Sequence, residues 1–350
     1  PPAVVQAMDD APHWFVDMHE LNEKAGNIIA TLTGAEAGLV TAGSAAGMVL
    51  EAAATMAGND PAKIWQLPDT SNMKNEIILH RAHRVNYDHS FRAAGAMLVE
   101  IGNASTTQEW ELENAINENT AAVAYIFGPR RGGAIPLRRT VEIAHQHDIP
   151  VIVDAAAMLP PLENLSRFIE EGADLVSFSG GKGVMGPQST GILAGRADLI
   201  EAAYANGAPN SVSVGRAAKV CKEEIAGLIT ALEIFVDTDF EAVNANWRAK
   251  CVHVVDELKE IPGLRVELEE ARPDHLEGGS NFAKAVIHFD QDWNGPNIED
   301  INQMLFDGDP GVRVGLSDIG DALAVYPVAL QPGEEEILAA RLKEVLTTGR

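Results

Sequence analysis

The feature of this sequence that most limits its fold is a regular alternation of short β-branched runs with alanine-rich stretches across residues 38–200. Repeated strand–helix units of this kind favour a parallel sheet that is covered by helices. The runs that indicate strands are Gly38–Thr41, Glu76–Leu79, Met97–Glu100, Thr120–Phe127, Pro150–Val153, Leu175–Phe178 and Gly191–Ala194. The stretches that indicate helices include Ser44–Met56, Tyr87–Ala94, Gln108–Ile116, Arg138–His147 and Pro161–Glu170. The sequence therefore predicts an α/β domain with a mostly parallel sheet.

The pattern changes after Asp198, where a long helical region is expected over about 198–260. Four short strands and a closing helix are expected after it, at Leu264–Leu268, Ala283–Phe289, Val312–Val314, Ala322–Tyr326 and Gly333–Leu346. Helices with a small sheet indicate a second, α+β domain. The predicted organisation is a helical segment at 1–37 that packs with the small domain, a large domain at 38–240 and a small C-terminal domain at 241–350.

The charge balance excludes some classes of partner. Fifty-one acidic residues against 26 basic ones give a formal net charge of −25, which repels phosphate backbones and anionic lipid heads, so neither nucleic acid nor membrane binding is expected. The most apolar stretch, 25–57, is interrupted by Asn27, Glu36 and Glu51 and does not resemble a membrane span. The only two cysteines, Cys221 and Cys251, predict no disulfide framework, and we expect a reducing, cytoplasmic location.

A carboxylate and a lysine follow two of the predicted strands. The apolar run that starts at Val151 ends in Asp154, and the next strand ends in a Ser/Gly-rich turn that presents Lys182. Ligands of open parallel sheets bind outside the carboxyl ends of the strands, so both side chains are expected in one crevice. A lysine that forms a Schiff base with an aldehyde, and an acid that pairs with a pyridine nitrogen, suit pyridoxal 5′-phosphate (PLP). Spacing alone leaves an alternative open, in which Lys182 is a surface lysine and Asp154 caps the next helix.

A possible phosphate site lies at the first predicted strand–helix junction. Thr41, Gly43, Ser44 and Ala45 form a small-residue turn at a helix start, where free N–H groups favour an anion, and Ser179 could contribute from the lysine turn. Ser44 is also expected as an ordinary N-cap. The turn lacks the G-x-G-x-x-G spacing and the later acidic residue of dinucleotide-binding proteins, which argues against the alternative of an NAD-dependent oxidoreductase.

Histidines follow another predicted strand. We expect His83 to stack on the cofactor ring, with His80 as the alternative, although either could be an ordinary hydrogen-bonding residue. His80, His83 and His89 could be argued as metal ligands, but they lack the i, i+4 pairing with a glutamate that is typical of zinc enzymes. We therefore expect no metal.

Several motifs together resemble the selenocysteine-synthase-like (SelA-like) family of fold type I PLP enzymes. This family includes L-seryl-tRNA(Sec) selenium transferase and D-glucosaminate-6-phosphate ammonia-lyase. The motifs occur in the family's order over about residues 20–345, at Thr33–Ala37, His83–Asp88, Val153–Ala156, Ser179–Gly191 and Gly215–Glu224. The resemblance implies a large domain with a mostly parallel seven-stranded sheet and a small C-terminal domain.

The resemblance also implies roles for individual residues. Lys182 would hold PLP as a Schiff base and act as the catalytic base, and Asp154 would pair with the pyridine nitrogen. Ala156 would pack on the ring face opposite His83, with the phosphate held by the turn at 43–45 and Ser179. The family's active site lies at a dimer interface, so a homodimer or larger homo-oligomer is expected, in which Gln188, Thr190 and Arg216 serve a neighbouring subunit. The acidity of this short chain makes a tRNA substrate improbable.

The reaction and the substrate are less constrained. Better-known family members favour β-elimination or β-replacement, so we expect a lyase that acts on a small polar amino acid. A racemase, an aldolase, a β-replacement transferase and a catalytically inactive assembly partner stay open as alternatives. A planar bidentate clamp for the substrate carboxylate calls for arginine. The candidates are Arg130, Arg131, Arg216 and Arg313, with Gln188 as a further substrate contact.

Overall fold

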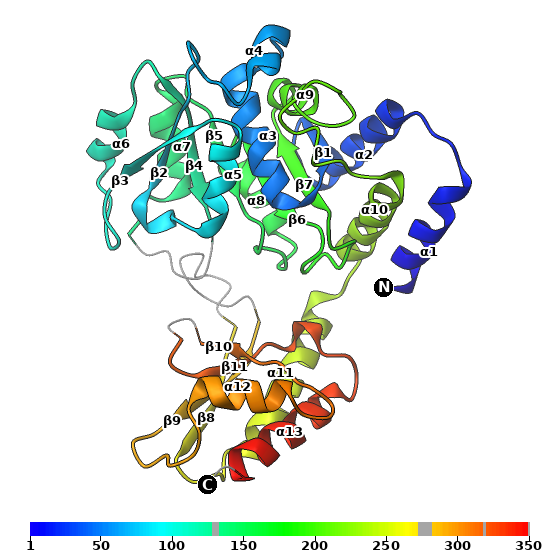
Figure 1. Cartoon of the computed structure of the whole chain (residues 1–350), viewed down its shortest axis with the longest axis vertical. Coiled ribbons are helices and arrows are strands. Elements are labelled where there is room, and N and C mark those ends of the chain that lie inside the picture. The colour runs from blue at the N-terminus through cyan, green and yellow to red at the C-terminus, as the bar shows by residue number, and fades with distance from the viewer. Residues whose placement is uncertain (128–132, 272–281, 318–319, 349–350) are drawn as a thin grey trace. The chain divides into compact units, whose positions relative to one another are not determined.

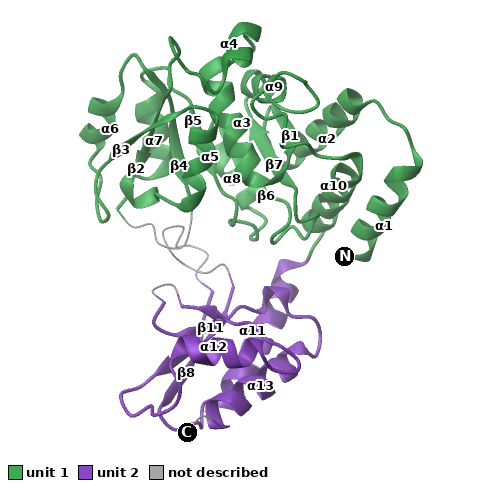
Figure 2. Ribbon diagram, in the orientation of Figure 1, with its two compact units in different colours: residues 1–238 green, residues 239–350 purple. Residues whose placement is uncertain are grey.

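A computed structural model describes residues 1–127, 133–271, 282–317 and 320–348. The chain divides into two compact units, Pro1–Thr238 and Asp239–Arg350, which are coloured separately in Figure 2. The expected division lay between residues 240 and 241. Each unit has its own hydrophobic core.

The first unit contains a seven-stranded sheet with the order β1-β7-β6-β5-β4-β2-β3 (Figure 1). Its strands are β1 (Ala37–Thr41), β2 (Glu76–His80), β3 (Met97–Ile101), β4 (Thr120–Ile126), β5 (Val151–Asp154), β6 (Leu175–Ser179) and β7 (Gly191–Gly195). All neighbouring strands are parallel except β7, which runs antiparallel to both β1 and β6. The mostly parallel sheet and all seven strands that the sequence predicts are therefore confirmed, with ends that differ by one residue.

Helices of the first unit connect and cover these strands. The α-helices are α1 (Pro2–Asp10), α2 (Met18–Thr33), α3 (Gly43–Ala57), α4 (Pro61–Gln66), α5 (His89–Ala93), α6 (Glu109–Ala115), α7 (Leu137–His145), α8 (Asn164–Glu170), α9 (Ala197–Ala205) and α10 (Lys222–Val236). Short 3-10 helices are η1 (Ala11–His13), η2 (Arg81–His83) and η3 (Asn86–Asp88). One core joins the buried face of α3 to alternate residues of the central strands, such as Ile152 and Leu175.

The N-terminal segment differs from expectation. Residues 1–37 belong to the first unit, not to the small domain, because α2 packs on β1 and α1 packs on α10. The close fit of α2 depends on small residues: a Cβ placed on Gly26 would lie 2.2 Å from the Gly38 carbonyl oxygen. Sequence periodicity identifies such helices, but it does not identify the surface against which they pack.

The helical region expected over about 198–260 is present in the structure. It is divided into α9, α10 and α11 (Phe240–Leu258), with an irregular segment between α9 and α10. Pro209 lies in that segment and cannot donate the backbone hydrogen bond that a helix interior requires.

The second unit combines α11 with a four-stranded sheet of order β10-β11-β9-β8. Its other elements are β8 (Leu264–Glu269), β9 (Lys284–Phe289), α12 (Ile298–Phe306), β10 (Gly315–Leu316), β11 (Leu323–Val325), η4 (Pro327–Ala329) and α13 (Glu334–Thr348). The strand expected at 312–314 is wrong, because the Val312 N–H donates to the Leu305 carbonyl and sheet pairing begins only at Gly315, opposite Ala324. Helix α12 was not anticipated from the sequence.

Candidate active site at the carboxyl edge of the sheet

The topology brings most of the predicted site residues to one edge of the sheet. Strands β1, β2, β4, β5 and β6 run in the same direction, so their carboxyl ends lie at the same edge, where β7 begins. Thr41 and Ser179 both pair with Gly191, and Asp154 pairs with Ser177. The turns that follow these strands therefore surround one region, as expected for an open α/β sheet.

Asp154 is held rigidly at the end of β5. Its side chain is buried, and its Oδ1 accepts a hydrogen bond of 3.0 Å from the Ala156 N–H. The Ala155 N–H donates to the Ser177 carbonyl, which ties this turn to β6. Ala156 itself is half-buried in the same turn.

The turn that carries Lys182 packs against the segment that follows Asp154. Glycine is required beside the lysine, because a Cβ on Gly183 would lie 2.2 Å from the Leu159 carbonyl oxygen. The turn is closed by a hydrogen bond of 2.8 Å from the Gly186 N–H to the Gly180 carbonyl. Lys182 is exposed at its tip. The structure thus brings the lysine turn beside the aspartate turn, as the sequence predicts.

The start of α3 offers unbonded backbone donors beside this turn. The helix begins at Gly43, whose φ is +78°, and its N-cap residue is Ala42, which has no side-chain acceptor. Ser44 is therefore in the first helical turn, and the expectation that it is the N-cap is wrong. The first N–H groups of a helix have no intrahelical acceptor and attract an anion. The Thr41 hydroxyl donates to the Gly43 carbonyl over 2.9 Å and so shapes this turn.

The β7 strand approaches this helix start closely. A Cβ on Gly191 would lie 2.4 Å from the Gly43 carbonyl carbon, so only glycine allows the contact. Ser179 pairs with the same glycine from the other side. Three neighbouring strands, β1, β7 and β6, thus bring together the residues that are predicted to bind the phosphate, among them Gly43, Ser44 and Ser179.

His83 lies in a buried aromatic cluster after β2. Its ring centroid is 4.5 Å from that of Tyr125 and 4.8 Å from that of His80. His80 has a structural role, since its Nε2 accepts from the Ile135 N–H over 3.3 Å, and burial lowers the pKa of His80 to about 4. Of the two alternatives, His83 is therefore the better candidate for contact with a flat ring.

The remaining predicted residues lie in different places. Gln188 and Arg216 are exposed in the first unit, whereas Thr190 is buried and its hydroxyl donates to the Pro187 carbonyl. Arg130 and Arg131 lie outside the described residues. Among the described residues, no group of three or more histidine, cysteine or acidic side chains is placed to hold a metal ion.

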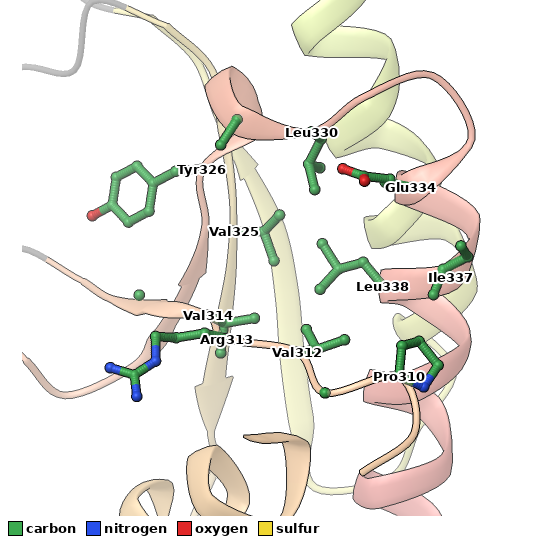
Figure 3. Close-up of a pocket in the computed structure, with 13 residues that line it drawn as sticks. Pro310, Val312, Arg313, Val314, Val325, Tyr326, Leu330, Glu334, Ile337 and Leu338 are labelled. Carbon is green, nitrogen blue, oxygen red and sulfur yellow. The ribbon is translucent and has the colours of Figure 1, made fainter. Parts of the chain in front are cut away.

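Arg313 belongs to the second unit, where it borders an apolar cavity of about 460 Å³. Figure 3 shows Val312, Val325 and Leu338 converging on this cavity, while the Arg313 guanidinium extends away from them. That group lies 5.0 Å from the centre of the Phe306 ring, in a cation–π contact.

Two buried polar residues at this edge were not identified from the sequence. Glu51 on α3 is completely buried, and so is Ser177 on β6. Burial, and then the neighbouring Asp154 carboxylate, raise the pKa of Glu51 well above its ordinary value. The sequence signal for Glu51 is an acidic residue within the otherwise small and apolar helix at 43–57.

The carboxyl edge thus contains a rigid buried carboxylate, a lysine on an adjacent glycine turn and an anion-binding helix start. These residues fit PLP, since the phosphate, the aldehyde and the ring nitrogen of that cofactor each have a counterpart among them. This combination of fold and site defines a fold type I PLP-dependent enzyme.

Comparisons with known proteins give the family. Residues 19–246 match the model of the L-seryl-tRNA selenium transferase (SelA) family, and the chain belongs to that family. It is 30% identical to the D-glucosaminate-6-phosphate ammonia lyase of Salmonella typhimurium, over 98% of this chain and 90% of that protein. It is 32% identical to the 5'-C-glycyluridine monooxygenase-decarboxylase of a Streptomyces species, over 98% of this chain and 85% of that protein.

A solved structure of a D-glucosaminate-6-phosphate ammonia-lyase matches all of this chain and 92% of that chain, with 29% identity and a TM-score of 0.85. The expected family, fold class and cofactor are therefore confirmed. Within the described residues, none of the helices has the length and apolar character needed to cross a bilayer.

Proposed function

We propose that the protein is a PLP-dependent lyase that removes the Cα proton and a β-substituent from a small polar amino acid. The observation that best supports this proposal is that the Lys182 turn, Asp154 and the N-terminal end of α3 lie together at one edge of the sheet. The similarity to an ammonia lyase over nearly the whole chain supports the same class of reaction.

Each residue of the site has a part in this proposal. Bound PLP would draw electrons away from the substrate Cα. Asp154, buried and fixed by Ala156, would pair with the ring nitrogen, and the N–H groups of residues 43–45 with the Ser179 hydroxyl would bind the phosphate. The Lys182 amine would hold the aldehyde in the resting enzyme and accept the Cα proton after a substrate replaces it.

The overall reaction that follows is an elimination. The Cα proton goes to the Lys182 amine, and the β-substituent leaves with its bonding electrons. Addition of water to the remaining enamine then yields a keto acid and ammonia. Arg216 and Gln188 are our candidates for the substrate carboxylate within the described part of the first unit, because both are exposed and chemically suited.

We further propose that two copies of the chain form the working enzyme, in the cytoplasm. The exposed Lys182 and the half-exposed Met185, at 49%, are unusual for a finished active site and would be covered by a second copy. Cys221 and Cys251 are both free thiols, which is consistent with a reducing compartment. Sedimentation equilibrium would test the dimer, and a monomer with full activity would contradict it.

Oxidative decarboxylation is a second candidate. The relative that carries the monooxygenase-decarboxylase name is as similar to this chain as the ammonia lyase is. A panel of D- and L-amino acids, including hydroxy and phosphorylated ones, separates the two reactions. A lyase releases ammonia and a keto acid without oxygen, whereas the alternative consumes oxygen and releases carbon dioxide.

The cofactor test comes first. The purified protein with added PLP should absorb at roughly 420 nm, as lysine-bound PLP typically does. Borohydride should then fix the cofactor on Lys182, which peptide mapping detects. A protein that takes up no PLP, or that is labelled at another lysine, would contradict the proposed site.

A further inference from the structure

Glu51 is a buried acid that the proposed reaction does not use. It lies in the middle of α3, a helix of small and apolar residues, and its side chain is fully buried. Neither of its oxygens has a partner within hydrogen-bond geometry among the described residues, and the same is true of the Ser177 hydroxyl. Burying a carboxyl group in this way costs free energy, so a contribution to function would explain its presence.

Glu51, Ser177 and Asp154 lie on the same side of the sheet. Asp154 is two residues after Ile152, and Ser177 is two residues after Leu175; both apolar residues belong to the core that includes α3. Because side chains alternate along a strand, Asp154 and Ser177 also face α3, and they are paired neighbours in β5 and β6.

The position of α3 over these strands is fixed by Gly47, which lies one helical turn before Glu51. A Cβ on Gly47 would lie 3.2 Å from the Ser177 Cβ, so the helix contacts β6 directly at this point. Residues four apart share a helix face, and Glu51 is therefore directed toward the same strands. The structure places an acid, a hydroxyl and the Asp154 carboxylate in one dry layer.

The two acids of this layer affect each other. Burial, and then repulsion by Asp154, raise the pKa of Glu51 well above its ordinary value, which favours the neutral form of its carboxyl group. A protonated carboxyl group has an O–H to donate, and Ser177 has a second one. Ser177 is the register partner of Asp154 in β6, and Glu51 belongs to the helix that covers these two strands.

We propose that Glu51 is a positioning residue: when the cofactor is bound, its neutral carboxyl group and the Ser177 hydroxyl, both without a hydrogen-bond partner in the part of the chain that the structure describes, turn their O–H groups toward Asp154 and keep its negative charge facing the cofactor's ring nitrogen. This inference rests on the proposed role of Asp154. Hydrogen bonds to an ionised carboxylate lower its affinity for a proton. The proton between the two groups then stays on the ring nitrogen, which is the form that draws electrons most strongly.

Two matched substitutions at Glu51 separate this role from simple packing. Glu51→Gln keeps a neutral side chain of the same size with an N–H donor, whereas Glu51→Leu keeps the size but removes every donor. The full-length variants are loaded with PLP whose ring nitrogen is isotopically labelled. The dissociation constant of PLP, the nuclear magnetic resonance shift of that nitrogen, and kcat with KM are then measured.

We expect Glu51→Leu to weaken PLP binding and lower kcat by about 10–100-fold, by analogy with the loss found when the hydrogen-bond partner of a metal-binding residue is removed. The nitrogen resonance should move toward the unprotonated position, while KM for the amino acid stays near that of the wild type. The Glu51→Gln variant should match the wild type in PLP affinity, in kcat and in the position of the nitrogen resonance. If Glu51→Leu does not fold, Ser177→Ala carries the test, with the same direction of change and a smaller size.

The outcomes that overturn the inference are distinct. A Glu51→Leu variant with the nitrogen resonance and PLP affinity of the wild type overturns it, even if its melting temperature has changed. A Glu51→Gln variant as impaired as Glu51→Leu overturns it as well, because a neutral donor would not suffice. If the wild type binds no PLP at Lys182, the proposed function itself is wrong. If Asp154→Ala lowers PLP affinity and kcat but Glu51→Leu does not, only the inference about Glu51 is wrong.

Discussion

Two buried aspartates at opposite edges of the same sheet have different surroundings. Asp174 precedes β6 at the amino edge, where its Oδ2 accepts from the Val151 N–H over 2.7 Å and lies 2.8 Å from His145 Nε2. Its Oδ1 lies 3.0 Å from the Arg196 guanidinium. These basic groups and backbone donors balance the charge of Asp174, so this edge is built for stability.

Asp154 lies at the carboxyl edge with a second acid on its protein side. Its Oδ1 accepts from Ala156, and the carboxyl group of Glu51 faces the same layer. The comparison teaches that two similarly buried carboxylates of one sheet can have different neighbours: Asp174 contacts a histidine and an arginine, whereas an acid, Glu51, lies in the same layer as Asp154.

The largest expected effect is at the carboxyl edge. Lys182→Ala should reduce turnover by about 10²–10⁴-fold, the contribution of a single general acid–base group. The exposed position of Lys182 predicts little change in melting temperature. Steady-state kinetics and calorimetry check both statements, and retained activity would show that another base is used.

Asp154→Ala tests the functional aspartate. We expect kcat to fall by about 10²–10³-fold, the usual cost of removing a group that stabilises charge in the transition state. PLP should also bind more weakly, as followed by absorbance titration. A kcat for Asp154→Ala near that of the wild type would contradict a functional role for the aspartate at the carboxyl edge.

A pH titration of stability tests His80, whose ring lies at the carboxyl end of β2. Its pKa of about 4 in the folded protein is below the ordinary value of 6.5, so the unfolded chain binds the extra proton first. Stability should therefore fall as the pH falls from 6.5 to 4, by about 3 kcal/mol from this group.

His80→Gln is the matched control for that titration, because the amide oxygen can still accept from the Ile135 N–H. Denaturant unfolding at several pH values gives the free energy of unfolding as a function of pH. Below pH 6.5 this free energy should fall less steeply for the variant than for the wild type. Equal slopes for the variant and the wild type would assign the acid sensitivity to other groups.

The smallest expected effect is at the amino edge. Asp174→Ala should lower the free energy of unfolding by about 1–3 kcal/mol, since it leaves the buried Val151 N–H without its acceptor. The half-exposed His145 and Arg196 can turn to water, which limits the loss. PLP affinity should be unchanged in this variant, and a clear loss of affinity would contradict the separation of the two edges.

Local patterns were sufficient for much of the fold and for the central residues of the site. The seven strands follow from β-branched runs, and the Lys182 turn follows from glycines that permit a close approach. The strand expected at 312–314 is wrong because backbone hydrogen bonds outside the sheet outweighed local hydrophobicity.

By itself, the sequence determined the sheet, the family and the pairing of Lys182 with Asp154, because these depend on residue order and on signals from near neighbours. Only the tertiary structure decided that residues 1–37 pack within the first unit, and that Glu51 and Ser177 share a dry layer with Asp154. Those contacts join segments that are far apart in the chain. Their electrostatic consequences depend on burial and the removal of water, which local sequence patterns do not specify.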